Sequence, residues 1–96
     1  MSAIDDPVLR ELRDQISATD RAILDAVNAR LELVARIKEH KEARGIGFLD
    51  PEREQAMLRN LAEANSGPLS EEGVRRLFTE ILDLTKQEVA GGGGPA

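Results

Sequence analysis

The sequence predicts an all-α protein with three helices, the first of which is much longer than the other two. Apolar residues recur at intervals of three and four over most of the chain, which is the period of an amphipathic helix. No glycine or proline interrupts residues 8–44. Each later helical segment begins at a residue type that caps helix N-termini, and the breaks between segments contain glycine or proline.

The first helix is expected from about Pro7 to about Ala43. Asp6 can cap it, and proline suits the first helical position because the amide hydrogen that it lacks is not needed there. Gly45 and Gly47 then end the helix in a loop. The apolar stripe of this helix contains Leu12, Ile16, Ile23, Val27, Val34 and Ile37.

Two shorter helices follow. Asp50-Pro51-Glu52 predicts an N-cap, a first helical residue and an acidic first turn, in a helix that continues to about Asn65. Ser66-Gly67-Pro68 predicts a turn, after which Ser70 caps the third helix. The apolar stripe of the third helix contains Val74, Leu77, Phe78, Ile81, Leu82, Thr85 and Val89.

Length and composition narrow the classes of function. The 96 residues predict one domain, residues 1–90, followed by a flexible glycine-rich tail, residues 91–96. The formal net charge of −5 argues against nucleic acid and anionic membranes as partners. No apolar run approaches the length of a membrane span, roughly 20 residues, and no signal-peptide core is evident, so a cytoplasmic location is expected. Without cysteine and with His40 as the single histidine, no metal, cofactor or covalent step is expected.

The length of the first helix predicts a second copy of the chain as a partner. About 36 helical residues span roughly 54 Å, whereas a compact domain of this size has a radius of gyration of about 13 Å. The remaining residues cannot cover the apolar stripe of so long a helix, so a homodimer is expected.

Two cations lie where the stripe of the first helix predicts apolar residues. Arg30 follows Val27 by three positions and precedes Val34 by four, and Lys41 follows Ile37 by four. Arg30 and Lys41 differ by about 20° in azimuth and lie about 16 Å apart along the helix axis. Because a buried unpaired charge is costly, an anion is expected to face them.

Two interpretations of these cations remain open. They can pair with glutamates of other helices, or they can line a cavity for a small dicarboxylate. Arginine favours the second because its guanidinium binds a carboxylate through two parallel hydrogen bonds, and Arg53 adds a cation on the second helix. Arg13 precedes Arg30 by about 25 Å of helix, so it can join such a site only from an antiparallel second chain. Its alternative role is that of a solvated surface residue.

Three further polar residues have competing structural roles. Asp50 and Glu54 are spaced i and i+4 and share a face of the second helix. Asp50 can instead cap that helix, and Glu54 can be an ordinary surface charge. The hydroxyl of Thr85, on the apolar stripe of the third helix, can bond back to its own helix.

Several short motifs occur in a characteristic order. They are Leu12-Arg13 with Ile16-Ser17 and Asp20, then Arg30, then Ile37-Lys38 with Lys41, then Leu49-Asp50-Pro51-Glu52-Arg53-Glu54, and finally Arg76-Leu77-Phe78 with Ile81-Leu82 and Thr85. Over about residues 8–89 their order and spacing resemble the all-helical, AroQ-type chorismate mutases. The resemblance implies a three-helix protomer in an intertwined homodimer with two active sites. It also implies an isomerase that converts chorismate to prephenate by a Claisen rearrangement, on the shikimate route to phenylalanine and tyrosine.

The resemblance assigns roles to the cations. Lys41 and Arg30 are implied as catalytic residues, with Lys41 contacting the ether oxygen and a carboxylate, and Arg30 binding a carboxylate. Arg13 is implied to come from the partner chain and to bind the other carboxylate. A fixed ammonium would stabilise the negative charge that develops on the ether oxygen as the C–O bond breaks. The substrate-binding residues implied are Arg13, Arg30, Lys41, Asp50, Arg53, Glu54 and Thr85.

The remaining implied roles concern the other end of the substrate. The residues matching Asp50 and Glu54 hold the hydroxyl end, the residue matching Arg53 organises the site, and that matching Thr85 lies in the pocket. One position departs from the pattern: Val89 stands where the family usually has glutamine or glutamate reaching the ether oxygen. Either the last helical turn is shifted or that contact is missing.

Other functions remain open on the same scaffold. Isochorismate pyruvate-lyases and amino-deoxychorismate mutases share it, and a non-catalytic helical dimerisation module that regulates a larger shikimate-pathway enzyme is a further alternative. If the chain were such a module, its inward-facing cations would only destabilise the fold, so replacing them would leave its function intact.

Overall fold

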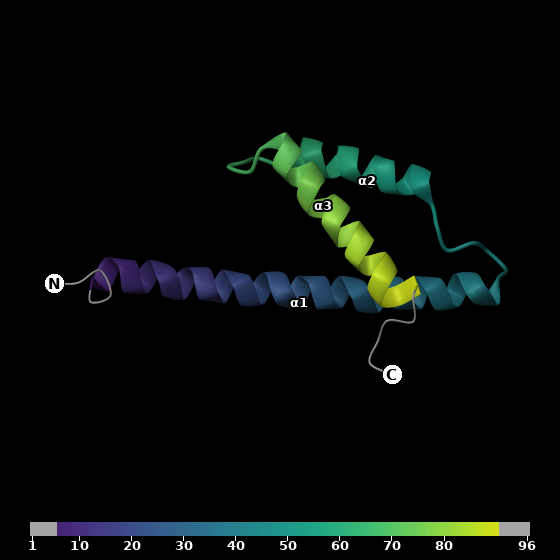
Figure 1. The fold of residues 1–96 in the computed structure, drawn as a ribbon, viewed down its shortest axis with the longest axis horizontal. Helices are drawn as coiled ribbons and strands as arrows, with labels where there is room; N and C mark the ends of the chain where they lie inside the picture. The colour runs from purple at the N-terminus through teal and green to yellow at the C-terminus, as the bar shows by residue number, and fades with distance from the viewer. Residues whose placement is uncertain (1–5, 91–96) are drawn as a thin grey trace. The chain divides into compact units, whose positions relative to one another are not determined.

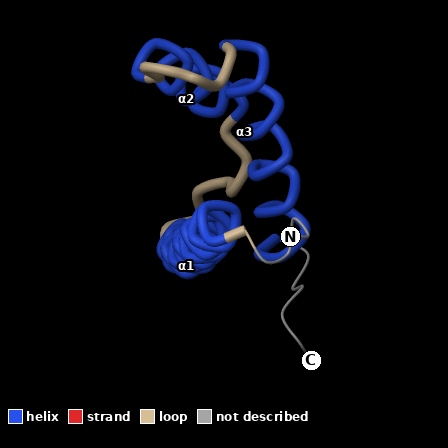
Figure 2. The backbone as a smooth tube through the Cα atoms, turned by 90° about the vertical axis from the view of Figure 1, so that its left-hand side faces the viewer, coloured by secondary structure: helices blue, strands red, loops and turns tan. Residues whose placement is uncertain are grey.

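The computed structural model describes residues 6–90, and every regular element in this range is helical. The order is α1 (Pro7–Ala43), α2 (Pro51–Ala64) and α3 (Glu71–Thr85), and α3 continues into a π-helical turn, η2 (Lys86–Ala90) (Figure 1). Loops join the helices, as the tube in Figure 2 shows. The predicted all-α class with one long N-terminal helix is confirmed. The predicted tail, residues 91–96, lies outside the described residues.

Helix α1 begins and ends where the sequence predicts. The Asp6 carboxylate oxygen Oδ1 accepts hydrogen bonds from the backbone N–H groups of Val8 (2.8 Å) and Leu9 (3.2 Å). These two donors have no partner inside the helix, so the cap satisfies them.

Gly45 ends α1. Its φ of 66° is left-handed, and the backbone N–H groups of Gly45 and Ile46 donate to the carbonyls of Glu42 (3.2 Å) and Lys41 (2.8 Å). This pair of bonds is the Schellman motif, which turns the chain away from the helix axis. Residues with a side chain seldom adopt this conformation, so the turn depends on glycine at this position.

We expect Gly45→Ala to lower the free energy of unfolding by about 1–2 kcal/mol, the cost of placing an L side chain in the left-handed region. Gly47→Ala is the matched control, because the φ of Gly47 is not in that region and a Cβ there would meet no atom within 4 Å. Urea unfolding followed by far-UV circular dichroism, at one protein concentration, measures both. Equal losses in the two variants would show that the left-handed turn is not what glycine supplies.

Caps also fix the ends of α2 and α3. The Asp50 carboxylate accepts from the backbone N–H of Arg53 (3.1 Å), and the Ser70 hydroxyl accepts from that of Gly73 (2.9 Å). Between the helices, the Asn65 side chain donates to the Leu69 carbonyl (2.6 Å) and accepts from the Gly67 amide (3.1 Å). These bonds hold the turn that returns α3 against α2.

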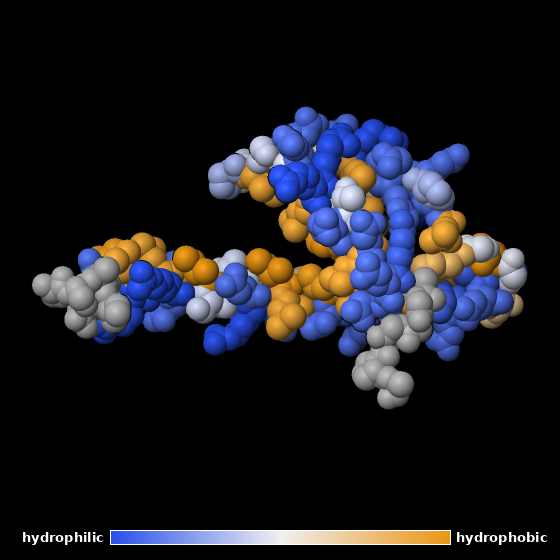
Figure 3. Space-filling view, in the orientation of Figure 1, coloured by the Kyte–Doolittle hydropathy of each residue, from blue (hydrophilic) through white to orange (hydrophobic). Residues whose placement is uncertain are grey.

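The described chain divides into two compact units, Met1–Arg30 and Leu31–Ala96. In the second unit α2 packs against α3, and the buried residues are Leu58, Val74 and Thr85. The first unit is the N-terminal part of α1, along which apolar side chains gather on the face shown in Figure 3. Its large exposed apolar residues are Val8, Leu12, Ile16, Ile23 and Leu24.

None of the 37 residues of α1 is buried. Even Ile37, on the stripe expected to face a core, is 46% exposed. A single chain therefore leaves the apolar stripe of α1 uncovered, which is the situation that the length of the predicted helix implied. None of the helices in residues 6–90 combines the length and apolar composition needed to cross a bilayer.

The C-terminal end of α3 departs from the prediction of one regular stripe through Val89. Regular α-helix ends at Thr85, and the next five residues form the π-turn η2. A π-turn contains more residues per turn than an α-helix, so it shifts the register of all residues that follow. Of the two alternatives at Val89, a shifted last helical turn is therefore the one observed.

Candidate functional site

Lys41 lies in the last turn of α1, next to the loop that the Gly45 turn directs. Its side chain is half-buried, and its Nζ donates a hydrogen bond to the carbonyl of Phe48 (3.3 Å). No carboxylate within residues 6–90 pairs with this ammonium. For Lys41, the interpretation as half of a glutamate ion pair therefore finds no support in the described part of the chain. A positive charge held by one neutral carbonyl can still attract an anion.

Asp50 and Arg53 open helix α2; Asp50 is exposed. Oδ1 of Asp50 is occupied by the backbone N–H of Arg53, so the structural role foreseen for Asp50 is observed. A carboxylate has a second oxygen and further lone pairs, so capping does not preclude ligand binding.

Glu54 lies one turn further along α2 and pairs with a residue that the sequence did not single out. Its Oε1 lies 2.9 Å from Nζ of Lys86, and the side chains of Lys86 and Glu54 are 38% and 23% exposed. The alternative role of Glu54, that of an ordinary surface charge, is therefore contradicted, because its side chain is half-buried and paired with Lys86 of η2. The sequence offered one signal for Lys86: it directly follows Thr85, a polar residue on an apolar stripe.

Thr85 is buried, with 5% of its surface exposed. Its hydroxyl donates to the carbonyl of Ile81 (2.6 Å), one turn earlier in α3. The back-bonding role predicted as the alternative is therefore observed. Any ligand that reaches this hydroxyl would meet its oxygen lone pairs rather than its proton.

Arg13 and Arg30 belong to the first unit, residues 1–30. Arg13 is exposed, whereas Arg30 is half-buried, as its place on the apolar stripe predicts. The structure thus brings Glu54 of α2 against Lys86, the residue that follows Thr85 at the start of η2, and places Lys41 beside the loop that leads to Asp50.

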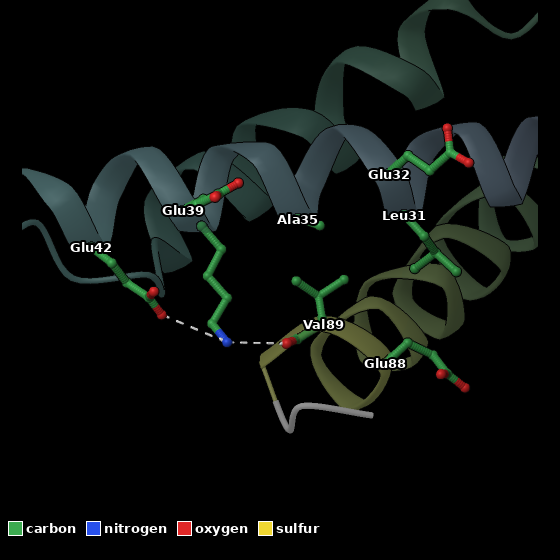
Figure 4. A pocket seen from close by; sticks show the side chains of 8 residues that line it. Leu31, Glu32, Ala35, Glu39, Glu42, Glu88 and Val89 are labelled. Atoms are coloured by element: carbon green, nitrogen blue, oxygen red, sulfur yellow. Dashed lines mark hydrogen bonds and ion pairs between the residues drawn. The ribbon is translucent and has the colours of Figure 1, made fainter. Parts of the chain in front are cut away.

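A separate groove of about 560 Å³ lies between the C-terminal part of α1 and η2. The Lys38 ammonium lies 3.7 Å from the Glu42 carboxylate and donates a hydrogen bond to the Val89 carbonyl (3.2 Å). The Val89 side chain points towards α1 (Figure 4). The acidic residues that line the groove are Glu32, Glu39, Glu42 and Glu88. Four carboxylates against one ammonium repel a dianion, so this groove is not the dicarboxylate site. No group of three or more potential metal ligands occurs within residues 6–90.

The chemistry available to the candidate residues is electrostatic. Lysine and arginine supply fixed positive charge for carboxylates, and the carboxylate of Glu54 and the hydroxyl of Thr85 supply hydrogen-bond acceptors. Fixed charges of this kind can orient a flexible dianion and stabilise charge that develops during a rearrangement. Such a reaction needs no nucleophile and no proton transfer.

Comparison with known proteins shows which family the chain resembles. The sequence model of the family described as chorismate mutase type II matches residues 12–89. The T-protein of Enterobacter agglomerans is 46% identical in an alignment of 77 positions, which covers 75% of this chain and 21% of that protein. The 4-amino-4-deoxychorismate mutase of Streptomyces pristinaespiralis is 33% identical in a gapped alignment of 99 positions, which covers 98% of this chain and 76% of that protein.

Among solved structures, the chain is similar to chorismate mutase (form I) from Thermus thermophilus. The TM-score is 0.79 at 34% identity, and the match covers 80% of this chain and 96% of that one. By contrast, the chain spans about a fifth of the length of the first curated relatives it matches.

Proposed function

The chain belongs to the chorismate mutase type II family, and from this premise we propose that it catalyses the rearrangement of chorismate to prephenate. The observation that carries the proposal is the match over residues 12–89, which includes every candidate site residue from Arg13 to Thr85. The similarity to the Thermus thermophilus enzyme along almost the whole of that shorter chain supports it.

In the proposed mechanism, Lys41 and Arg30 are the catalytic residues. The Lys41 ammonium donates to the ether oxygen, where negative charge grows as the C–O bond breaks and the new C–C bond forms. Because that charge is larger in the transition state than in the substrate, the interaction lowers the barrier. Arg30 binds a carboxylate and restricts the substrate to the reactive chair-like conformation.

The other proposed contacts orient the ring. Glu54 accepts a hydrogen bond from the ring hydroxyl, with Asp50 beside it on the same face of α2, and Thr85 lies in the pocket wall. Arg53 organises the entrance to the site. The half-buried position of Glu54 and the buried position of Thr85, where α2 meets α3, support these assignments.

We propose that the active form is an intertwined homodimer, in which Arg13 of one chain binds the second carboxylate of a substrate held by the other. The exposed apolar residues of α1 support this assembly, because leaving them in water forfeits the free energy of their burial. The greater length of the T-protein supports a larger shikimate-pathway enzyme as a further partner or fusion. A cytoplasmic location stays a prediction from the sequence.

A second candidate activity is favoured by one observation. The relative named 4-amino-4-deoxychorismate mutase aligns with 98% of the length of this chain. The same cations would serve that reaction, since the two substrates differ only in a ring hydroxyl or amine.

Turnover of purified protein tests the proposal. We expect the absorbance of chorismate to fall in the presence of enzyme, with phenylpyruvate formed after acid treatment of the product. Release of pyruvate would identify an isochorismate-type lyase instead, and turnover of the 4-amino compound alone would identify the second candidate. No turnover of any of these compounds by a folded dimer would favour the non-catalytic module.

A further inference from the structure

The contact between Glu54 and Lys86 differs from two other ion pairs, Lys38–Glu42 and Arg75–Glu71. Those two join residues four apart on one helix, at 3.7 Å, with one partner at least 65% exposed. In the Glu54–Lys86 pair, Oε1 and Nζ lie 2.9 Å apart, and the side chains are 23% and 38% exposed. This pair links the start of α2 with the start of η2, directly after α3. A shorter and drier pair interacts more strongly.

The position of Lys86 is fixed from several directions. Its backbone N–H donates to the carbonyls of both Leu82 and Asp83, and the preceding residue, Thr85, is buried and bonded to Ile81. The ammonium is therefore carried by a backbone that is anchored on the buried side of α3. This anchoring holds the positive charge beside Glu54 before any ligand arrives.

A carboxylate alone at this place would select a cation. In the proposed site Glu54 faces the substituent of the ring, and an ammonium there would gain a salt bridge, whereas a hydroxyl would gain one hydrogen bond. Lys86 reverses this preference. Its charge offsets that of Glu54 and repels a second ammonium, while its remaining N–H donors can reach a hydroxyl oxygen.

We propose that Lys86 is a specificity-determining residue, which makes the site prefer a ring hydroxyl over a ring amine by positioning and neutralising Glu54. The proposal rests on the proposed function, because it takes Glu54 as the group nearest the ring substituent. It assigns the hydroxyl-bearing substrate, rather than its 4-amino counterpart, to this chain.

The values of kcat/KM for chorismate and for 4-amino-4-deoxychorismate, with kcat and KM resolved for each compound, test Lys86. The wild-type protein is expected to favour chorismate. In Lys86→Gln the ratio of the two kcat/KM values should shift towards the amine by about fivefold or more, the effect of one partly shielded charge. Lys86→Arg retains the charge and should retain the preference. Arg75→Gln is the matched control, since it removes an exposed pair of the same helix, and its ratio should equal that of wild type.

The outcomes separate the proposals. If Lys86→Gln lowers both kcat/KM values equally, the pair is merely structural and the specificity proposal is overturned; a wild-type preference for the amine also overturns it. If Lys86→Gln fails to fold, Lys86→Met takes its place, because methionine keeps the length of the side chain and favours helix while removing the charge, and the same shift towards the amine is expected. Wild-type protein that turns over chorismate while the ratios stay constant refutes only the role of Lys86. Wild-type protein that turns over neither compound refutes the proposed function and, with it, this inference.

Discussion

Replacing Lys41 with methionine is expected to lower kcat for chorismate by about 100- to 1,000-fold, the usual effect of removing one preorganised donor to a developing negative charge. The contact between Nζ of Lys41 and the Phe48 carbonyl holds the ammonium in place ahead of the reaction. Methionine keeps the length of the side chain and is a good helix former, so α1 should persist. Steady-state kinetics that separate kcat from KM measure the effect.

Lys38→Met provides the control for this loss. Lys38 lies on the same helix, is 27% exposed and also donates to a backbone carbonyl, that of Val89 at 3.2 Å. Its ammonium faces the acidic groove instead of the proposed site. The Lys38 variant should therefore keep a kcat close to that of wild type. Comparable losses in both variants, or nearly normal turnover in Lys41→Met, would remove Lys41 from the catalytic role.

The helices could be predicted because their ends are local. Asp6, Asp50 and Ser70 each use an oxygen of their own side chain to satisfy amides two or three residues later, and Gly45 alone supplies the left-handed turn after α1. Each of these interactions spans a few residues, so the sequence contains all the partners. The predicted limits of α1 are confirmed for the same reason.

Features that depend on distant partners could not be predicted in this way. Lys86 meets Glu54 only because α3 returns against α2, a packing that residue spacing does not determine. The π-turn Lys86–Ala90 contains no glycine or proline to indicate it, and π-turns are rare. The back-bonding of Thr85 was foreseen, since its partner Ile81 lies four residues away on the same helix.

Mixing two inactive variants, Arg13→Ala and Lys41→Ala, is expected to restore about one quarter of wild-type activity. In an equimolar mixture about half of the two-fold symmetric dimers contain one chain of each kind. If Arg13 crosses to the partner, one site of such a dimer carries both substitutions and the other carries neither. Half of the dimers then have one intact site out of two, so one quarter of all sites are intact and about one quarter of the wild-type activity returns. The exposed position of Arg13, on a part of α1 whose apolar neighbours are also exposed, agrees with a residue that a partner chain would cover.

A mixture of Arg30→Ala with Lys41→Ala distinguishes a shared site from simple rescue. In the proposed arrangement one chain supplies both residues to the same site, so every site in the mixed dimer lacks one of them. Partial unfolding and refolding exchanges the chains, and sedimentation checks that dimers have formed again. Activity should then return only in the mixture that contains Arg13→Ala. Recovery in both mixtures would mean that Arg30 and Lys41 serve different sites. Recovery in neither, with mixed dimers present, would mean that Arg13 does not complete the partner's site, since a residue that does so must be supplied by an intact neighbour.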